Sequence, residues 1–325
     1  MTQSPPRSIA GTIPSAGSVA PSPDAPGGGG FPRWRNPAKN RLVRAYFQSP
    51  VAAISLVILV IIVFLATFAP WIAPTNPYDL GTVTVVNSRL PPGATARIGD
   101  TVFLLGSDGA GRDLLSAILY GLRTSIIVAA ASTGIAVLIG LWVGLLAAYV
   151  GGRTDAALMR LVDLQLSFPT MLVALMLLAI LGNGLDKIIA ALVIVQWAYF
   201  ARTARAAALV EREKEYMEAA RGLYLGHGRM IFRHLMPNSI APLIVVATIQ
   251  AAHAVSLEAT LSFLGLGLPP TEPSLGLLIA NGFNYVFSLH WWISLFPGLA
   301  LLLTIVVMNL AGDRLRDLLN PRLRK

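Results

Sequence analysis

Cysteine is absent from the sequence, and ionisable residues are scarce. The lack of cysteine excludes disulfides, thiolate metal sites and a cysteine nucleophile. Charged residues make up 13% of the 325 positions and apolar residues 55%, whereas soluble domains are typically about 25% charged. A chain this apolar has too little polar surface to cover its core in water, but a lipid bilayer can solvate an apolar exterior. The composition therefore indicates a membrane protein.

Motifs for nucleotide and metal chemistry are also missing. No Gly-x-x-x-x-Gly-Lys-Ser/Thr phosphate-binding loop occurs, so any ATP must be bound by another chain. The four histidines, at positions 227, 234, 253 and 290, include no pair at metal-ligand spacing. No set of residues resembles a catalytic constellation, so we expect no enzymatic activity, no cofactor and no metal ion.

Apolar runs long enough to cross a bilayer predict six membrane-spanning helices. About 20 residues at about 1.5 Å each cross a hydrocarbon core of about 30 Å. The first run, Val51–Ala73, carries no charge and is too long for the apolar part of a signal peptide. Ser274–His290 is apolar but interrupted by two asparagines and a glycine, and we place it outside the membrane as a surface or re-entrant helix. The expected spans are 51–73, part of 124–150, 155–181, 187–207, 240–261 and 291–311.

Basic residues are distributed unevenly between the two sides that these spans define. Twenty lysines and arginines fall on the side of the two termini and the 202–239 loop, and five fall on the other side. Loops rich in Lys and Arg stay in the cytoplasm. The bias predicts that both termini are cytoplasmic. It also explains the formal charge of +9 without a nucleic-acid partner.

Composition divides the chain into four parts. Residues 1–50 begin with a stretch rich in Pro, Gly and Ser, which predicts disorder followed by a basic cytoplasmic arm. Residues 51–123 hold the first span and a long external segment. Residues 124–312 form a core with five spans, and residues 313–325 form a cytoplasmic tail. The expected fold class is therefore an all-α, polytopic membrane protein.

Three charged residues and one helix-breaking proline in or near the spans have structural explanations. Arg160 and Asp163 lie three residues apart, and we expect them to neutralise each other on one helix face. Pro169 is expected to kink the same helix. Asp113 precedes an apolar run, where its charge favours the positive end of a helix dipole.

The loop between the fourth and fifth spans carries the most specific pattern. Its segment Glu218-Ala219-Ala220-Arg221 is followed by Pro237 just before the next span. This pattern resembles the cytoplasmic loop of importer permeases of the ATP-binding-cassette class, which begins Glu-Ala-Ala and forms a short helix that docks in a cleft of the ATPase. The resemblance implies an ATPase-docking loop that includes Glu218, Ala219, Ala220, Arg221, Gly222, Tyr224, Gly226 and Pro237.

Tyr224 departs from the family pattern, in which glycine usually lies six residues after the glutamate. A tyrosine does not easily adopt a positive φ. We therefore expect Gly222 or Gly226 to form the turn in its place, or the docking helix to have a slightly different shape.

Other stretches resemble the peptide and nickel branch of the same class. The resemblance covers residues 51–325 and looks like the second-named permease of dipeptide and oligopeptide systems. It implies the type I (MetI-like) importer fold and a location in the bacterial cytoplasmic membrane. The implied partners are a homologous permease, two ATPase subunits and an extracytoplasmic solute-binding protein. The stretches are Leu105-Gly106-Ser107-Asp108 with Gly111-Arg112-Asp113, Leu261–Gly267, and Phe296-Pro297-Gly298 with Asn320-Pro321-Arg322.

Glu258 lies late in the fifth span, and no basic residue is within a turn or two of it. An ionisable group in a span is costly and usually faces a cavity or a partner. We therefore expect Glu258 to contact the partner permease or to line the translocation path, with a structural role as the alternative.

An ion-coupled secondary transporter or channel is the competing hypothesis for the whole chain. Such a protein needs ionisable residues in several spans and often has internal repeats. Only Glu258 and the Arg160/Asp163 pair qualify here, and no clear repeat is present. The expected function is therefore the membrane subunit of an ATP-driven importer that moves peptide-like solutes by alternating access.

Overall fold

Helices dominate the computed structural model, which describes residues 46–319 except 78 and 80–82. The predicted disordered stretch before residue 46 and the last six residues of the tail lie outside this part of the chain. The helices are α2 (Pro50–Thr67), α3 (Ala69–Ile72), α4 (Leu114–Val150), α5 (Gly152–Ser167), α6 (Thr170–Leu181), α7 (Leu185–Arg212), α8 (Glu215–Gly222), α9 (His227–Arg229), α10 (Met236–Phe263), α11 (Leu275–Phe283) and α12 (Trp292–Leu319). Shorter elements are the 3-10 turn η1 (Val85–Asn87), the π-helical segment η2 (Met230–Leu235) and the antiparallel strands β1 (Ala94–Thr95) and β2 (Val102–Phe103).

The predicted number of spans agrees with the helices that the structure describes. Five of them are long and apolar enough to cross a membrane: α2, α4, α7, α10 with the short helical turns before it, and α12. The predicted third span is the pair α5 and α6, which are bent by 89° relative to each other. Counting this pair as one span gives six.

The bend between α5 and α6 lies at Pro169, as predicted. The residue before a proline is pushed out of the helical region, and Phe168 is extended, with φ −92° and ψ 143°. The helix therefore ends at Ser167 and begins again at Thr170. The proline thus breaks the helix completely.

The expected pairing of Arg160 with Asp163 is wrong. Asp163 forms an ion pair with Arg202 of α7 instead. A second pair joins the same two helices, because Arg205 contacts Asp155 at 2.5 Å. The reason is tertiary, since α5 packs alongside α7 and brings the arginines of that helix opposite its acids.

Small residues bring α4 and α7 into close contact. A Cβ atom on Gly140 would lie 2.4 Å from the Cβ of Phe200, and one on Gly144 would lie 2.5 Å from the carbonyl oxygen of Ala201. Glycines four residues apart are typical of tightly packed membrane helices, because they let two backbones approach. Larger side chains at these two positions would push the helices apart.

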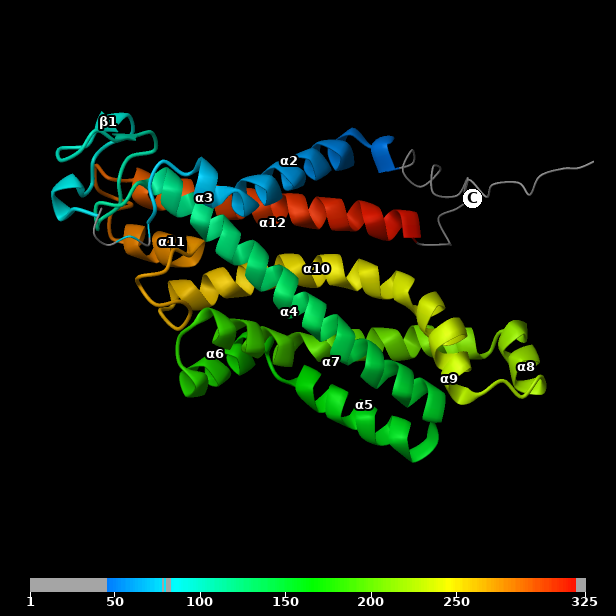
Figure 1. Cartoon of the computed structure of the whole chain (residues 1–325). Helices are drawn as coiled ribbons and strands as arrows, with labels where there is room; N and C mark the ends of the chain where they lie inside the picture. Colours follow the sequence, from blue (N-terminus) through cyan, green and yellow to red (C-terminus); the bar gives the residue numbers. More distant parts are fainter. Residues whose placement is uncertain (1–45, 78, 80–82, 320–325) are drawn as a thin grey trace, which may run out of the picture.

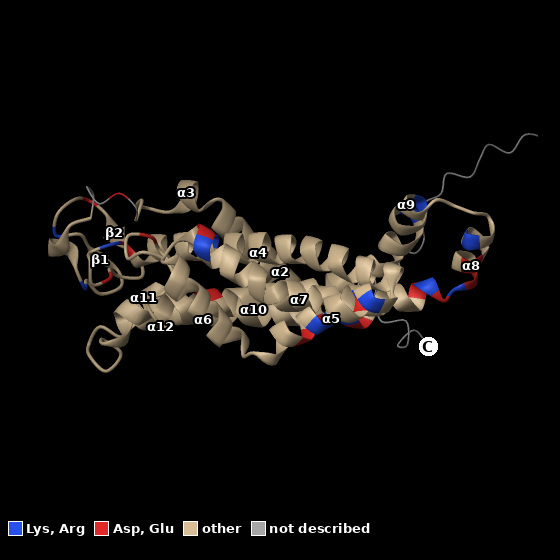
Figure 2. Ribbon diagram, turned by 90° about the horizontal axis from the view of Figure 1, so that it is seen from below, with Lys and Arg blue, Asp and Glu red and all other residues tan. Residues whose placement is uncertain are grey.

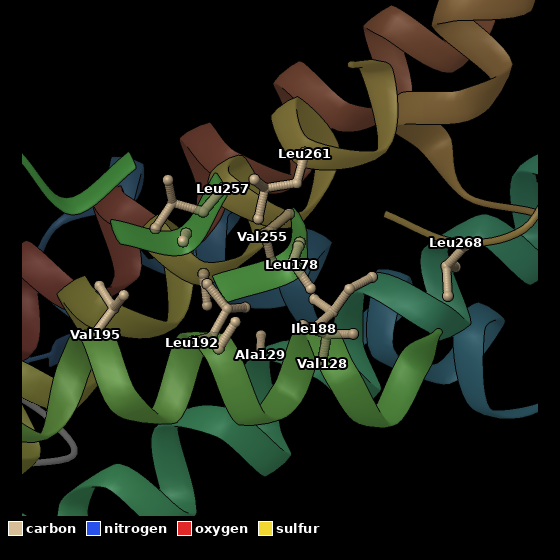
Figure 3. Packing of buried hydrophobic residues seen from close by; sticks show 13 residues of the cluster. Val128, Ala129, Leu178, Ile188, Leu192, Val195, Val255, Leu257, Leu261 and Leu268 are labelled. Atoms are coloured by element: carbon tan, nitrogen blue, oxygen red, sulfur yellow. The ribbon is translucent and has the colours of Figure 1, made fainter. Parts of the chain in front are cut away.

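A central apolar cluster joins α4 and α7 to α6 and α10 (Figure 3). Leu178 of α6 and Leu192 of α7 are buried in it, together with Val255 and Leu261 of α10. The cluster holds α6, the second half of the broken span, against the long helices α4, α7 and α10.

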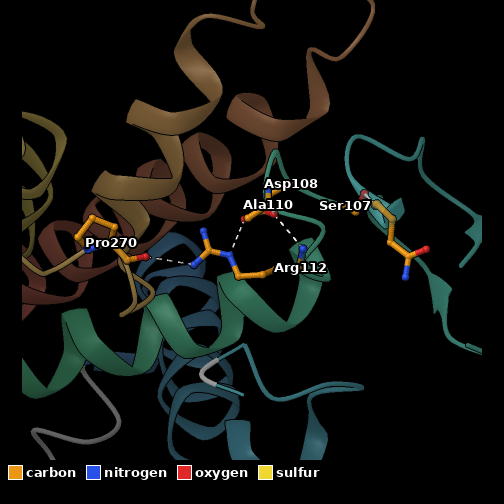
Figure 4. Close-up of polar contacts among 6 residues, drawn as sticks. Ser107, Asp108, Ala110, Arg112 and Pro270 are labelled. Atoms are coloured by element: carbon orange, nitrogen blue, oxygen red, sulfur yellow. Dashed lines mark hydrogen bonds and ion pairs between the residues drawn. The ribbon is translucent and has the colours of Figure 1, made fainter. Parts of the chain in front are cut away.

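One end of the bundle, here called the β1 end, carries the segment between α3 and α4 (Figure 1). Asp113 caps α4 by accepting the Ser116 N–H at 2.8 Å, which confirms its expected place at a helix N-terminus. Asp108 and Arg112 form a buried ion pair at 2.7 Å, and Arg112 also donates to the carbonyl of Pro270 at 3.5 Å (Figure 4). These contacts fasten the segment to the loop that follows α10.

Helix α11 also lies at the β1 end, and it is too short to be a span. Its nine residues extend about 14 Å, less than half of the hydrocarbon thickness. It packs against α10 and α12. The prediction that this region does not cross the membrane agrees with the helix length.

The opposite end, here called the α8 end, holds the start of α2, the end of α12 and helices α8 and α9 (Figure 1). Charged residues are sparse along the middle of the spans; they lie over the β1 end and, toward the other end, around α5, the end of α7, α8 and α9 (Figure 2). Both described chain ends and the large basic loop therefore lie on one side, as the charge bias requires.

Candidate functional site

The connection between α7 and α10, residues 213–235, is called the α7–α10 loop below. Its helix α8 buries one face, where Met217 is 0% and Ala220 4% exposed. Glu218 and Ala219 lie on the exposed face. Within the described part of the chain, no hydrogen bond or ion pair holds the Glu218 carboxylate. The helix thus presents an unpaired charge and a small side chain outward.

Helix α8 ends in a turn that centres on Tyr224. The Tyr224 N–H donates to the Arg221 carbonyl at 2.9 Å, and the Leu225 N–H donates to the Ala220 carbonyl at 3.2 Å. These two bonds define a Schellman motif, whose next-to-last position prefers glycine because it is left-handed. Tyr224 occupies that position with φ +52°.

The expectation that a neighbouring glycine would replace Tyr224 in the turn is therefore wrong. Gly222 is the last residue of α8, and Gly226 has φ −59°. The two hydrogen bonds decide which residue must be left-handed, whatever its type. The tyrosine costs about 1–2 kcal/mol of backbone strain there, and its side chain is 95% exposed.

A hydrogen-bond network braces α8 against its neighbours. Glu211, at the end of α7, contacts Lys214 Nζ at 2.5 Å and accepts the Tyr216 hydroxyl at 2.8 Å. Asn238, at the start of α10, donates to the Tyr216 oxygen at 3.1 Å. Burial, and then the hydrogen bond to Glu211, raise the pKa of Tyr216. Its hydroxyl therefore stays protonated at neutral pH and holds three helices together.

The loop is also attached to the end of α4. Arg212 donates to the Ala148 carbonyl at 2.6 Å, and the Tyr149 hydroxyl lies 2.5 Å from His227 Nδ1. Met230 and Leu235 are buried where η2 leads into α10. Pro237 is exposed in the first turn of α10, where a proline is tolerated.

The structure thus places all eight predicted loop residues at one end of the bundle, on or beside α8. Ala220 faces inward, Arg221 donates to the Arg212 carbonyl at 3.4 Å, and Glu218, Ala219 and Tyr224 are exposed. Leu223, which the sequence analysis did not single out, adds an apolar side chain that is 74% exposed. The exposed side chains thus include one carboxylate, Glu218, one small group, Ala219, and two large groups, Leu223 and Tyr224.

Glu258 lies far from this loop and has a different environment. It is 0% exposed and accepts hydrogen bonds from the hydroxyls of Ser125 at 2.9 Å, Ser262 at 2.9 Å and Ser274 at 2.8 Å. These serines belong to α4, to α10 and to the N-terminal cap of α11. The chain itself encloses the carboxylate, and the expected contact with a second permease or with the translocation path stays a prediction.

Close packing explains how the Glu258 cluster forms. A Cβ atom on Gly276 would lie 2.0 Å from the Ala259 carbonyl oxygen, so only glycine lets α11 approach α10 this closely. That approach brings Ser274 next to Glu258. Ser262, four residues after Glu258, could have been noticed in the sequence, whereas Ser125 has no local signal. The described residues contain no group of three or more His, Asp or Glu that could hold a metal ion.

Two family models match the chain. Residues 140–325 match the binding-protein-dependent transport system inner membrane component. Residues 40–92 match the N-terminal transmembrane domain of oligopeptide transport permease C. The first match contains the α7–α10 loop and Glu258, and the second contains α2.

Curated relatives cover most of the chain. The di/tripeptide transport system permease protein DppC of Pseudomonas aeruginosa is 39% identical over 83% of this chain and 87% of its own length. The probable D,D-dipeptide transport system permease protein DdpC of Escherichia coli is 38% identical over 87% of this chain and 91% of its own. The dipeptide permease DppC of Escherichia coli is 40% identical over 84% and 90%, respectively.

A solved structure has the same fold. A chain of the MetNI methionine ABC transporter, in an inward-facing conformation, superimposes with a TM-score of 0.52 at 19% identity. The match covers 63% of this chain and 97% of that chain. The likeness concerns the arrangement of helices alone.

Proposed function

The chain belongs to the binding-protein-dependent transport system inner membrane components, and from this membership we propose its place in a complete importer. It is a multi-pass membrane subunit of an ATP-binding-cassette importer, and the names of its relatives support peptides as the solute class. In the proposed assembly it pairs with a homologous permease. Two ATPase subunits dock on the α8 end, a solute-binding protein delivers solute at the β1 end, and membrane lipid surrounds the spans.

The observation that carries this proposal is the exposed face of α8. It presents the small side chain of Ala219 and the carboxylates of Glu215 and Glu218, neither of which has a partner among the described residues, and the helix is braced on the side away from solvent. A braced helix can transmit a push from a partner, whereas a free loop would absorb it. These properties fit a surface that an ATPase grips and moves.

A continuous set of contacts leads from α8 to the far side of the bundle. The Tyr216–Asn238 hydrogen bond joins α8 to the start of α10. Helix α10 has 28 residues and extends about 42 Å. At its other end, Glu258 is bonded to α4 and to the cap of α11.

We infer that α10 acts as a lever in alternating access. When the ATPases close on ATP, their movement would shift α8, tilt α10, and carry α4 and α11 along through the Glu258 cluster. The two permeases would then open a central path to one side and afterwards to the other. ATP is hydrolysed in the partner subunits, and this chain contributes binding and movement.

The charge bias supports a cytoplasmic location for the α8 end. Twenty of the basic residues belong to the side that contains the α7–α10 loop and both termini, and the described chain ends lie at that end. Ion-coupled transport is less well supported, because its main candidate group, Glu258, is 0% exposed and fully engaged.

The test is reconstitution of the permease pair with its ATPases and its binding protein in proteoliposomes. We expect peptide uptake only when ATP is present on the α8 side, and no uptake when a proton or sodium gradient replaces ATP. Gradient-driven uptake without ATP would refute the proposal. A cysteine introduced at Gly93 and labelled only from the opposite side would establish the orientation independently.

A further inference from the structure

A cavity of about 430 Å³ opens at the α8 end, between the end of α4 and the α7–α10 loop. Its lining includes Tyr149, Arg212, Arg221, Tyr224 and His227. Three of these side chains are basic, and none of the described residues that line the cavity is acidic. The cavity is therefore suited to an anion.

The two arginines retain most of their hydrogen-bonding capacity. Arg212 donates to the Ala148 carbonyl at 2.6 Å, and Arg221 donates to the Arg212 carbonyl at 3.4 Å. A guanidinium has five N–H donors, so most of them stay available. Neither arginine forms an ion pair with an acid among the described residues. Two guanidinium groups without a carboxylate are matched in charge and geometry to a phosphate.

An apolar strip on α4 continues from this cavity toward the middle of the span. Trp142 lies seven residues before Tyr149, on the same helix face, and is 46% exposed. It contacts Phe232 edge to face, with ring centroids 5.4 Å apart, and Phe232 is 53% exposed. Leu138 and Leu146 are 59% and 50% exposed on the same helix. Tryptophan and tyrosine beside basic residues, here Trp142 and Tyr149, are typical of a membrane–water interface.

We propose that this cavity binds the phosphate headgroup of an anionic phospholipid whose acyl chains lie along the α4 strip. Arg212 and Arg221 donate to the phosphate oxygens, and His227 lines the same cavity. Basic pockets at the ends of membrane helices suit such headgroups. The combination of an anion site and an apolar strip favours a lipid over a soluble anion or an acidic side chain of the ATPase, neither of which needs the strip.

Native mass spectrometry of the full-length chain, purified with its subunits in neutral detergent, tests the proposal. Phosphatidylglycerol and phosphatidylcholine with identical acyl chains are titrated separately, and inorganic phosphate is added as a competitor. The test variants are Arg221→Gln and the double variant Arg221→Gln/His227→Gln. The matched control is Arg229→Gln, which removes the same charge from an exposed α9 residue outside the cavity lining. Thermal melts in the same detergent identify any variant that fails to fold.

We expect phosphatidylglycerol to bind about tenfold more tightly than phosphatidylcholine, and Arg221→Gln to remove about that factor. Arg221→Lys should keep part of the preference because the charge remains, and Arg229→Gln should change it less than about twofold. Equal binding of the two lipids, or an equal loss in Arg229→Gln, would overturn the proposal. Displacement of the lipid by an equimolar amount of inorganic phosphate would also overturn it, as would loss of ATPase retention in Arg221→Gln with unchanged lipid binding.

Discussion

The α7–α10 loop and the Glu258 cluster each centre on a glutamate, and the two carboxylates have opposite surroundings. Glu218 is exposed and has no partner among the described residues. Glu258 is 0% exposed and accepts three serine hydroxyls. The two residues are connected through α10, which begins near the loop and carries Glu258 toward its far end.

The difference shows that a charge near a membrane span can serve either of two purposes. An exposed, unpaired carboxylate is available to another subunit. A buried carboxylate whose hydrogen bonds are all satisfied joins helices of its own chain, because a buried donor left without its acceptor would lower the free energy of unfolding. We therefore expect changes at Glu218 to affect assembly and coupling, and changes at Glu258 to affect stability first.

The largest effect is expected for Glu218→Lys. If Glu218 meets a basic or amide group in the ATPase cleft, losing one partner of a desolvated pair costs about 2–5 kcal/mol, and reversing the charge adds repulsion. The variant should fold normally, lose bound ATPase during purification and lose solute-stimulated ATP hydrolysis. Glu213→Lys, an exposed residue just before α8, is the matched control. Full coupling in Glu218→Lys would leave only shape as the docking feature.

The next largest effect is expected for Glu258→Ala. Each stranded buried hydroxyl costs about 1–3 kcal/mol, and rebonding of the serines to their own helices limits the total to about 3 kcal/mol. Glu258→Gln keeps one acceptor oxygen and should lose less. Thermal melts in detergent measure both, with Thr260→Ala as the control, because its hydroxyl bonds only within α10.

Transport measurements sharpen the same comparison. If Glu258 is a cross-link, transport and thermal stability should fall together across the alanine and glutamine variants. If the glutamine variant keeps normal stability but loses transport, Glu258 lines the translocation path instead.

A smaller effect of opposite sign is expected for Tyr224→Gly. Glycine adopts φ +52° without strain, so the variant should gain about 1 kcal/mol in loop stability, after the entropy that glycine loses on folding. Gly226→Ala is the control, since its φ of −59° suits alanine and an added Cβ would contact nothing within 4 Å. Protection of the loop against limited proteolysis is the measurement. Damage from Gly226→Ala without a gain from Tyr224→Gly would place the sensitive turn residue at 226.

The smallest effect is expected for Tyr216→Phe, which removes the hydroxyl between Glu211 and Asn238. The net loss should be about 0.5 kcal/mol, the lower end for a hydrogen bond, because Tyr216 is 37% exposed. The raised pKa of Tyr216 means that this contribution is present below about pH 10, its usual value, and is lost only as the pH rises through the higher folded pKa. The difference between Tyr216→Phe and wild type should therefore be constant from about pH 6 to 9. Tyr224→Phe, whose side chain is 95% exposed, should show no such loss.

Features that depend on neighbouring residues were predictable from the sequence. The uncharged run after residue 50, the break at Pro169 and the cap at Asp113 all appear in the structure. The four-residue spacing of Gly140 and Gly144 indicates close helix packing, but the sequence analysis did not use it. The turn at Tyr224 could not be predicted, because the hydrogen-bond pattern at the end of α8 decided which residue is left-handed.

By itself, the sequence determined the membrane class, the span count and the position of the α7–α10 loop. These follow from the transfer of apolar runs into lipid and from local motifs, which need no distant partner. Only the tertiary structure decided the partners of the polar groups. Asp163 pairs with Arg202 across two helices, and Ser125 donates to Glu258 from 133 positions away. A buried polar group must find a partner somewhere in the folded chain, and the packing of the helices, here permitted by glycines, decides which partner it meets.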